Sequence, residues 1–106
     1  MPVLETGTVT TKITAFQTPY LKKSGRVVDF RCEFNGGYSI NTNTLVAVIP
    51  AGFRPSVHRI ILSVPVDGGS GVQTGHGEAI ISMTGDVTIN VDKVGLVCIC
   101  ATWLIE

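Results

Sequence analysis

Four side chains in this sequence are of kinds that proteins use to bind sugars: Trp103, His76, Asp67 and Arg54. An indole plane stacks on the C–H face of a sugar ring. Imidazole and carboxylate groups match neighbouring hydroxyls, because they provide planar donors and paired acceptors. A guanidinium donates hydrogen bonds to hydroxyls or to a glycerol-phosphate anion. Together these residue types predict a shallow saccharide site.

Each of these residues also has a structural interpretation, which the sequence leaves open. Arg54 lies in a loop bounded by two prolines and could donate to backbone carbonyls of that loop. Trp103 could pack in the core or at an interface, and His76 could lie at a solvated loop tip. The polar loop around Asn41 and Asn43 could contact a sugar or only satisfy its own turns.

Enzymatic motifs are missing from the sequence. It has no G-x-S-x-G, no H-E-x-x-H and no phosphate-binding glycine loop before a helix. Asp67, His76 and Glu78 do not have the ligand spacing of a known metal site. A glycosidase needs two carboxylates across a cleft, and no such pair is evident. We therefore expect a protein that is not an enzyme and that has no cofactor and no metal.

Composition places the chain among single β domains. Val, Ile and Thr make up 36 of its 106 residues, and such β-branched residues favour strands. Its 8 Lys and Arg balance its 8 Asp and Glu, so the chain lacks the basic surplus of proteins that bind nucleic acid or lipid surfaces. No apolar stretch reaches the roughly 20 residues of a membrane-spanning helix. We expect no nucleic-acid partner and no membrane insertion.

The cysteines and the start of the chain indicate synthesis in a cytoplasm. Three cysteines is an odd number, and their spacing implies no disulfide framework. Cys98 and Cys100 share one face of any strand, where neighbouring thiols bridge poorly. We interpret all three as small buried apolar groups. The N-terminus lacks the basic and apolar regions of a secretory signal.

Alternating segments separated by Gly, Pro and Asn predict an all-β antiparallel β-sandwich or barrel. The clearest strand is 28–34, with one dry and one wet face, and Pro65 indicates an edge or a bulge in strand 57–66. Residues 67–77 contain five glycines and are interpreted as a long mobile loop that carries His76. Segments 78–83 and 87–91 form a hairpin.

The last segment, 95–105, is mostly apolar on both faces. A strand that is dry on both sides lies at a sheet centre, and in a single sandwich its second face needs another subunit to cover it. Only 15% of the residues are charged, which also favours burial between identical subunits. We therefore predict a homo-oligomer.

One order of motifs resembles a known family. It begins with Ile49-Pro50-Ala51-Gly52-Phe53-Arg54-Pro55-Ser56 and continues with an apolar strand, the stretch IISMTGDVTI and a terminal strand. It is similar to the receptor-binding head domains of tailed-phage fibre and baseplate proteins, such as those of lactococcal siphophages. The resemblance covers about residues 25–105. It implies a compact β head, a homotrimer, and non-enzymatic capture of host cell-wall saccharide near subunit interfaces.

On this interpretation, residues 25–106 are the head, and residues 1–24 are its N-terminal segment and first strand or the remnant of a neck. The protein would belong to the virion, at the tail tip or baseplate, with other tail proteins as partners. Two alternatives stay open: a structural virion or assembly module without a ligand, and a host interaction domain of the trimeric cytokine-like or complement-like type.

Overall fold

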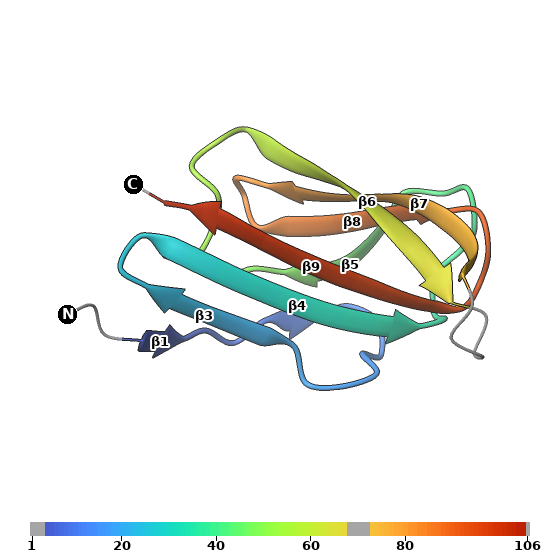
Figure 1. Ribbon diagram of the computed structural model, residues 1–106, viewed down its shortest axis with the longest axis horizontal. Coiled ribbons are helices and arrows are strands. Elements are labelled where there is room, and N and C mark those ends of the chain that lie inside the picture. Colours follow the sequence, from blue (N-terminus) through green and yellow to red (C-terminus); the bar gives the residue numbers. More distant parts are fainter. Residues whose placement is uncertain (1–3, 68–72, 106) are drawn as a thin grey trace.

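The computed structural model describes residues 4–67 and 73–105, which form nine antiparallel strands (Figure 1). Within these ranges no helix is long and apolar enough to cross a membrane. The strands are β1 (Leu4–Thr6), β2 (Thr10–Thr11), β3 (Tyr20–Ser24), β4 (Val27–Asn35), β5 (Thr44–Val48), β6 (Arg59–Asp67), β7 (Gln73–Ser82), β8 (Asp86–Val91) and β9 (Leu96–Leu104). The all-β antiparallel class predicted from the sequence is confirmed.

All nine strands belong to one curled sheet, a half-barrel, with the order β1-β3-β4-β9-β6-β7-β8-β5-β2. β9 pairs with β6 only at Val66↔Val97 and Asp67↔Leu96, so the sheet turns sharply between them. In Figure 1, β6 therefore crosses away from β9, and β7 and β8 lie on the side of β9 opposite to β4. The sheet encloses its own core by folding over at this narrow junction.

The N-terminal segment connects the two edges of the sheet. β1 pairs with β3 at one edge, and β2 pairs with β5 at the other. Four residue steps separate Thr6 from Thr10, and an extended chain of that length spans at most about 14 Å. The two edges therefore lie close together, and the curl is nearly complete on this side.

The core consists of the inward faces of the strands. In β4 the side chains of Val28, Phe30, Cys32 and Phe34 are buried, and those between them are half-buried or exposed, as the alternation predicts. The ring of Phe30 packs at a tilt on that of Trp103, with 6.1 Å between centroids. Twenty buried residues form this core, and none of the buried side chains is charged or polar by type among the residues described.

β9 lies near the sheet centre, as predicted, but the chain itself covers only one of its faces. The inward-facing Val97 and Ile99 are completely buried. On the outer face Cys98 is half-buried, whereas Cys100 and Leu104 are exposed. The prediction that all three cysteines are buried is therefore wrong for Cys100, because alternation places it on the open side of the sheet.

The predicted loop 67–77 is wrong over residues 73–77, which form the start of β7, while residues 68–72 lie outside the described residues. His76 is thus on a strand. Its flanking glycines allow close backbone approach, not loop freedom. A Cβ added at Gly77 would lie 2.1 Å from the Asn90 carbonyl oxygen, and one at Gly75 would lie 2.5 Å from an Asp92 carboxylate oxygen.

Pro65 fits the edge or bulge that the sequence predicts. β6 pairs with β7 along its length, but its other side meets β9 only at the last two residues, which leaves Pro65 on an open edge. The register shifts between Val66 and Asp67, immediately after the proline.

Gly77→Ala is expected to lower the free energy of unfolding by about 1–3 kcal/mol, since the new methyl group meets backbone that cannot move aside. Gly7→Ala is the matched control. There the nearest atoms belong to side chains, Leu21 Cδ2 at 2.7 Å and the Phe53 ring at 3.1 Å, and not to the backbone. Urea unfolding measures both variants, and equal losses would contradict the close approach of β7 and β8.

Candidate functional site

The structure separates the four predicted site residues into two pairs at opposite ends of the molecule. Asp67 and His76 form one pair, and Trp103 and Arg54 form the other, since Trp103 is bonded to Phe53, the residue before Arg54. Asp67 lies opposite Leu96 at the start of β9, and Trp103 lies near its end, opposite Val28. Seven residue steps along a strand span about 23 Å. His76 lies near the Asp67 end, opposite Pro65. One ligand of the size of a monosaccharide cannot contact all four residues.

Trp103 is a packing residue in this chain. Only 6% of its surface is exposed, and its indole Nε1 donates a hydrogen bond to the Phe53 carbonyl oxygen at 2.7 Å. The bond connects the loop after β5 to β9. The indole presents no open face for stacking on a sugar in the single chain.

Arg54 anchors its own loop. Its Nε donates to the Ile49 carbonyl oxygen at 2.8 Å, which confirms the structural interpretation of this residue. The guanidinium lies against Gly85, where an added Cβ would come within 2.5 Å of Nε and where φ is +93°. Arg54 also lines a shallow hollow with Lys23, Gly52, Ser56 and Ile105.

A polar hollow is on the outer face of β7 and β8, and it includes His76. Its volume is about 490 Å³. The lining residues are Asn41, Asn43, Ser63, His76, Gly77, Glu78, Ile80, Thr88, Ile89, Asn90, Val91 and Asp92. We call this hollow the β7–β8 groove. Of the four predicted residues, only His76 lines it.

Strand register builds the β7–β8 groove. Ser63, Glu78 and Asn90 lie directly opposite one another on β6, β7 and β8, so their side chains form a polar row across the sheet. The amide nitrogen of Asn90 donates to the Asn43 side-chain oxygen at 3.0 Å, which extends the row beyond β8.

His76 and Asp92 form the end of the groove. The backbone N–H of His76 donates to Asp92 Oδ1 at 2.8 Å, and its Nδ1 lies 3.7 Å from Asp92 Oδ2. The imidazole is 77% exposed, so one face remains open to a ligand. Asn41 lies on the side of β8 away from β7. It has a positive φ of 53°, and its N–H donates to the carbonyl oxygen of Val91, the residue before Asp92.

The groove has the chemistry of a hydroxyl-binding surface. It offers two hydroxyls, two carboxylates, an imidazole and three amides around the apolar side chain of Ile80. Within the described part of the chain, no aromatic ring other than the imidazole lines it, and neither does any Lys or Arg. The described residues contain no cluster of three or more potential metal ligands. Hydrogen bonding to a neutral, polyhydroxylated ligand suits this arrangement best.

Sequence reasoning missed Ser63, Thr88, Asn90 and Asp92 as groove residues. Part of the signal was present, because the outward positions of 86–90 are all polar and alternate with apolar inward residues. What the sequence did not provide was the register that places Ser63 opposite Glu78. Asn41 and Asn43, noted as a polar loop, do lie at the rim.

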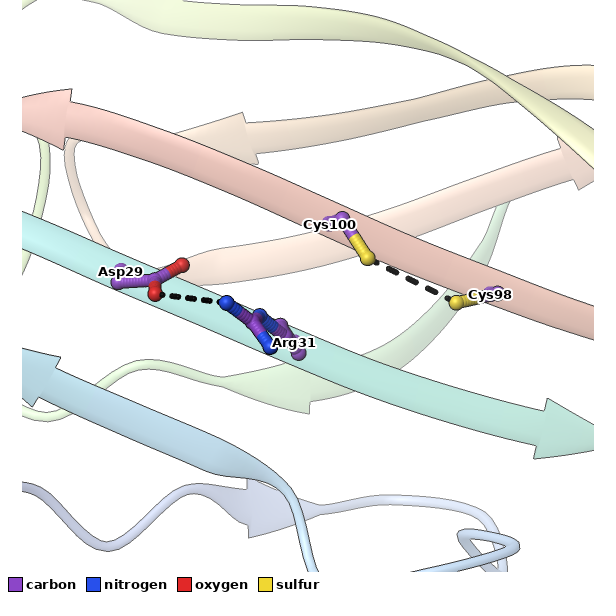
Figure 2. A network of polar contacts seen from close by, with 4 residues as sticks. All are labelled: Asp29, Arg31, Cys98 and Cys100. Carbon is purple, nitrogen blue, oxygen red and sulfur yellow. Dashed lines mark hydrogen bonds and ion pairs between the residues drawn. The ribbon is translucent and has the colours of Figure 1, made fainter.

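A second polar feature is on the outer face of β9, where the Sγ atoms of Cys98 and Cys100 lie 3.7 Å apart (Figure 2). Burial, followed by the contact with Cys100, raises the pKa of Cys98 from 9.0 to about 11. Burial raises the pKa of the inward-facing Cys32 to about 12. Both thiols are therefore protonated near neutral pH.

The chain matches no known protein family, no curated protein and no solved structure in the comparisons made. The groove and the sequence resemblance are therefore the two observations that bear on its function.

Trp103→Phe keeps an aromatic ring in the core but removes the donor to the Phe53 carbonyl oxygen. The expected loss is about 1–3 kcal/mol, because the carbonyl loses its partner in a partly buried position. Chemical denaturation monitored by circular dichroism measures it. Unchanged stability would show that the indole N–H does not hold this loop.

Stability should fall as pH rises from about 9 towards 12. In this range the unfolded chain releases the Cys32 proton, whose ordinary pKa is 9.0, while the folded chain retains it up to about 12. The unfolded state therefore becomes favoured with increasing pH. Denaturation midpoints across this range should fall less steeply in Cys32→Ala than in the unmodified chain. A slope equal to that of the unmodified chain would contradict the burial of this thiol.

Proposed function

We propose that this protein is a non-enzymatic saccharide-binding head that attaches a phage tail tip or baseplate to the host cell wall. The observation that carries the proposal is the β7–β8 groove, a shallow hollow with hydroxyl, amide, imidazole and carboxylate groups around one apolar side chain. The resemblance of residues 25–105 to phage receptor-binding heads supplies the biological setting.

The ligand class follows from the charge of the groove. Among the residues that the structure describes, Glu78 and Asp92 are the charged ones that line it, besides the titratable His76. Two carboxylates disfavour a phosphate and tolerate a neutral or amino-substituted sugar. The proposed ligand is therefore a neutral or amino saccharide of the wall, not its glycerol-phosphate polymer. Arg54 lies outside this groove, and its Nε is bound to the Ile49 carbonyl.

Attachment through such sites requires several copies. A shallow hydroxyl-binding site exchanges hydrogen bonds with water for hydrogen bonds with protein at small net gain. We propose a homotrimer, in which three sites act together through effective concentration. An apolar patch of Val27, Leu104 and Val57 is the contact surface that suits a trimer. Val27 and Leu104 lie opposite each other on β4 and β9, and Val57 is in the adjoining loop. Their exposed fractions are 44%, 60% and 56%. Ser56 connects this loop to the Leu104 carbonyl.

The binding proposal is tested by nuclear magnetic resonance titration with glucose, glucosamine and glycerol phosphate as probes. The sugars should shift backbone signals of β7 and β8 with dissociation constants of about 1 mM or weaker, about 4 kcal/mol of binding free energy or less. Glycerol phosphate should leave these signals unchanged. Glu78→Gln or His76→Ala should weaken sugar binding several-fold.

Asp86→Asn is the matched control, because Asp86 is an exposed carboxylate on β8 outside the groove. It should bind the sugars as the unmodified chain does. Sugar-induced shifts confined to the Trp103 and Arg54 end would contradict the groove. Release of shortened products from wall oligosaccharide would contradict the non-enzymatic role.

A structural virion module without a ligand is the second candidate. The observation that favours it is that Trp103, the residue best suited to stack on a sugar, is buried and donates to the Phe53 carbonyl of its own chain. A stable trimer by light scattering, together with no signal shift for any sugar in the titration, would select this candidate over the first.

A further inference from the structure

The outer face of β9 presents two thiols that point to the same side of the sheet. Cys98 is half-buried and Cys100 is exposed, and their sulfur atoms lie 3.7 Å apart. Figure 2 shows both side chains projecting from the same face of the strand. They lie apart from the β7–β8 groove, none of whose lining residues belongs to β9.

The sulfur separation matches what a tetrahedral thiophilic ion requires. Zinc binds thiolates at about 2.3 Å. Two sulfurs on adjacent corners of a tetrahedron with that bond length lie about 3.8 Å apart. The distance of 3.7 Å in the protein therefore needs almost no adjustment. Soft thiolate ligands select zinc and its heavier d¹⁰ relatives over oxygen-seeking cations.

A disulfide between the same two thiols fits less well. Residues two apart on a strand have Cα atoms about 6.6 Å apart. This is at the long end of the range that disulfides tolerate. β9 pairs with β4 at every position from Leu96 to Leu104, so its backbone cannot shorten without breaking that ladder. A bridging ion needs no such shortening.

The charges around the thiols also permit a cation. Glu33 lies directly opposite Cys98 on β4 and contributes negative charge beside it. Arg31 lies opposite Cys100, but its guanidinium is paired with Asp29 at 3.2 Å, as Figure 2 shows. It also lies 5.2 Å from the centre of the Tyr20 ring. The charge of Arg31 also reaches Cys98, where it lowers the pKa of the thiol and so favours the thiolate that a metal ion binds.

We propose that Cys98 and Cys100 form a two-thiolate binding site for a thiophilic divalent ion such as Zn²⁺ on the outer face of β9. The ion displaces one proton from each thiol to solvent and forms two metal–sulfur bonds. Water occupies its remaining positions, since the described residues place no third His, Cys, Asp or Glu in ligand range. The site is open, and it does not depend on the saccharide groove.

Cadmium is the probe for this site, because cadmium–thiolate bonds give an ultraviolet charge-transfer band. The reduced, folded chain should bind one Cd²⁺ per polypeptide with this band, and Zn²⁺ should remove the band by competition. Cys98→Ser and Cys100→Ser should each weaken cadmium binding by about tenfold or more, because each removes a direct ligand.

Cys32→Ala is the matched control, since Cys32 is the third thiol of the chain and is buried on the inner face. It should bind cadmium as the unmodified chain does, with its fold checked by circular dichroism. A folded, reduced chain without the band would overturn the proposal, as would binding that persists in either serine variant. Two free thiols fewer than expected in the chain purified without reductant would instead identify a disulfide and also overturn it.

Discussion

One-sided burial is the constraint on which the rest of this structure depends. The long strands bury one apolar face and leave the other face more open, as in β4, where Phe30 and Phe34 are fully buried and Arg31 is exposed. A flat sheet of nine such strands would leave one broad apolar face in water. The chain avoids this by curling the sheet over its own apolar face, with the turn at the short β9–β6 pairing and the N-terminal segment joining the edges.

The curl of the sheet leaves its outer surface and the loops as the places where a ligand can bind. Because the inner face is filled with core side chains, every group available to a ligand is an outward-facing strand residue or lies in a loop. The β7–β8 groove and the thiol pair of β9 are both built in this way, from side chains two residues apart on one strand or opposite each other on neighbouring strands. Neither site needs a loop to hold its groups in place.

Trp103 and Arg54, whose residue types predict ligand binding, make structural hydrogen bonds in the folded chain. Two polar side chains hold the loop after β5 in place, one by bonding it to β9 and one by bonding it to its own first residue. Trp103 donates to its Phe53 carbonyl, and Arg54 donates to the Ile49 carbonyl beside the β7–β8 turn. Buried backbone carbonyls need such partners, since leaving them unpaired costs free energy. Residue type alone could not distinguish this role from sugar binding.

The sequence by itself determined the all-β class, the one-sided pattern of β4, the hairpin of β7 and β8 and the shared face of Cys98 and Cys100, because these depend on local alternation and turn residues. Only the tertiary structure decided what depends on register between strands distant in sequence. It placed His76 on a strand beside Asp92, since Gly75 and Gly77 permit close approach of two backbones there. It also aligned Ser63 with Glu78 and Asn90. This alignment depends on the register between paired strands, which residue spacing within each strand does not specify.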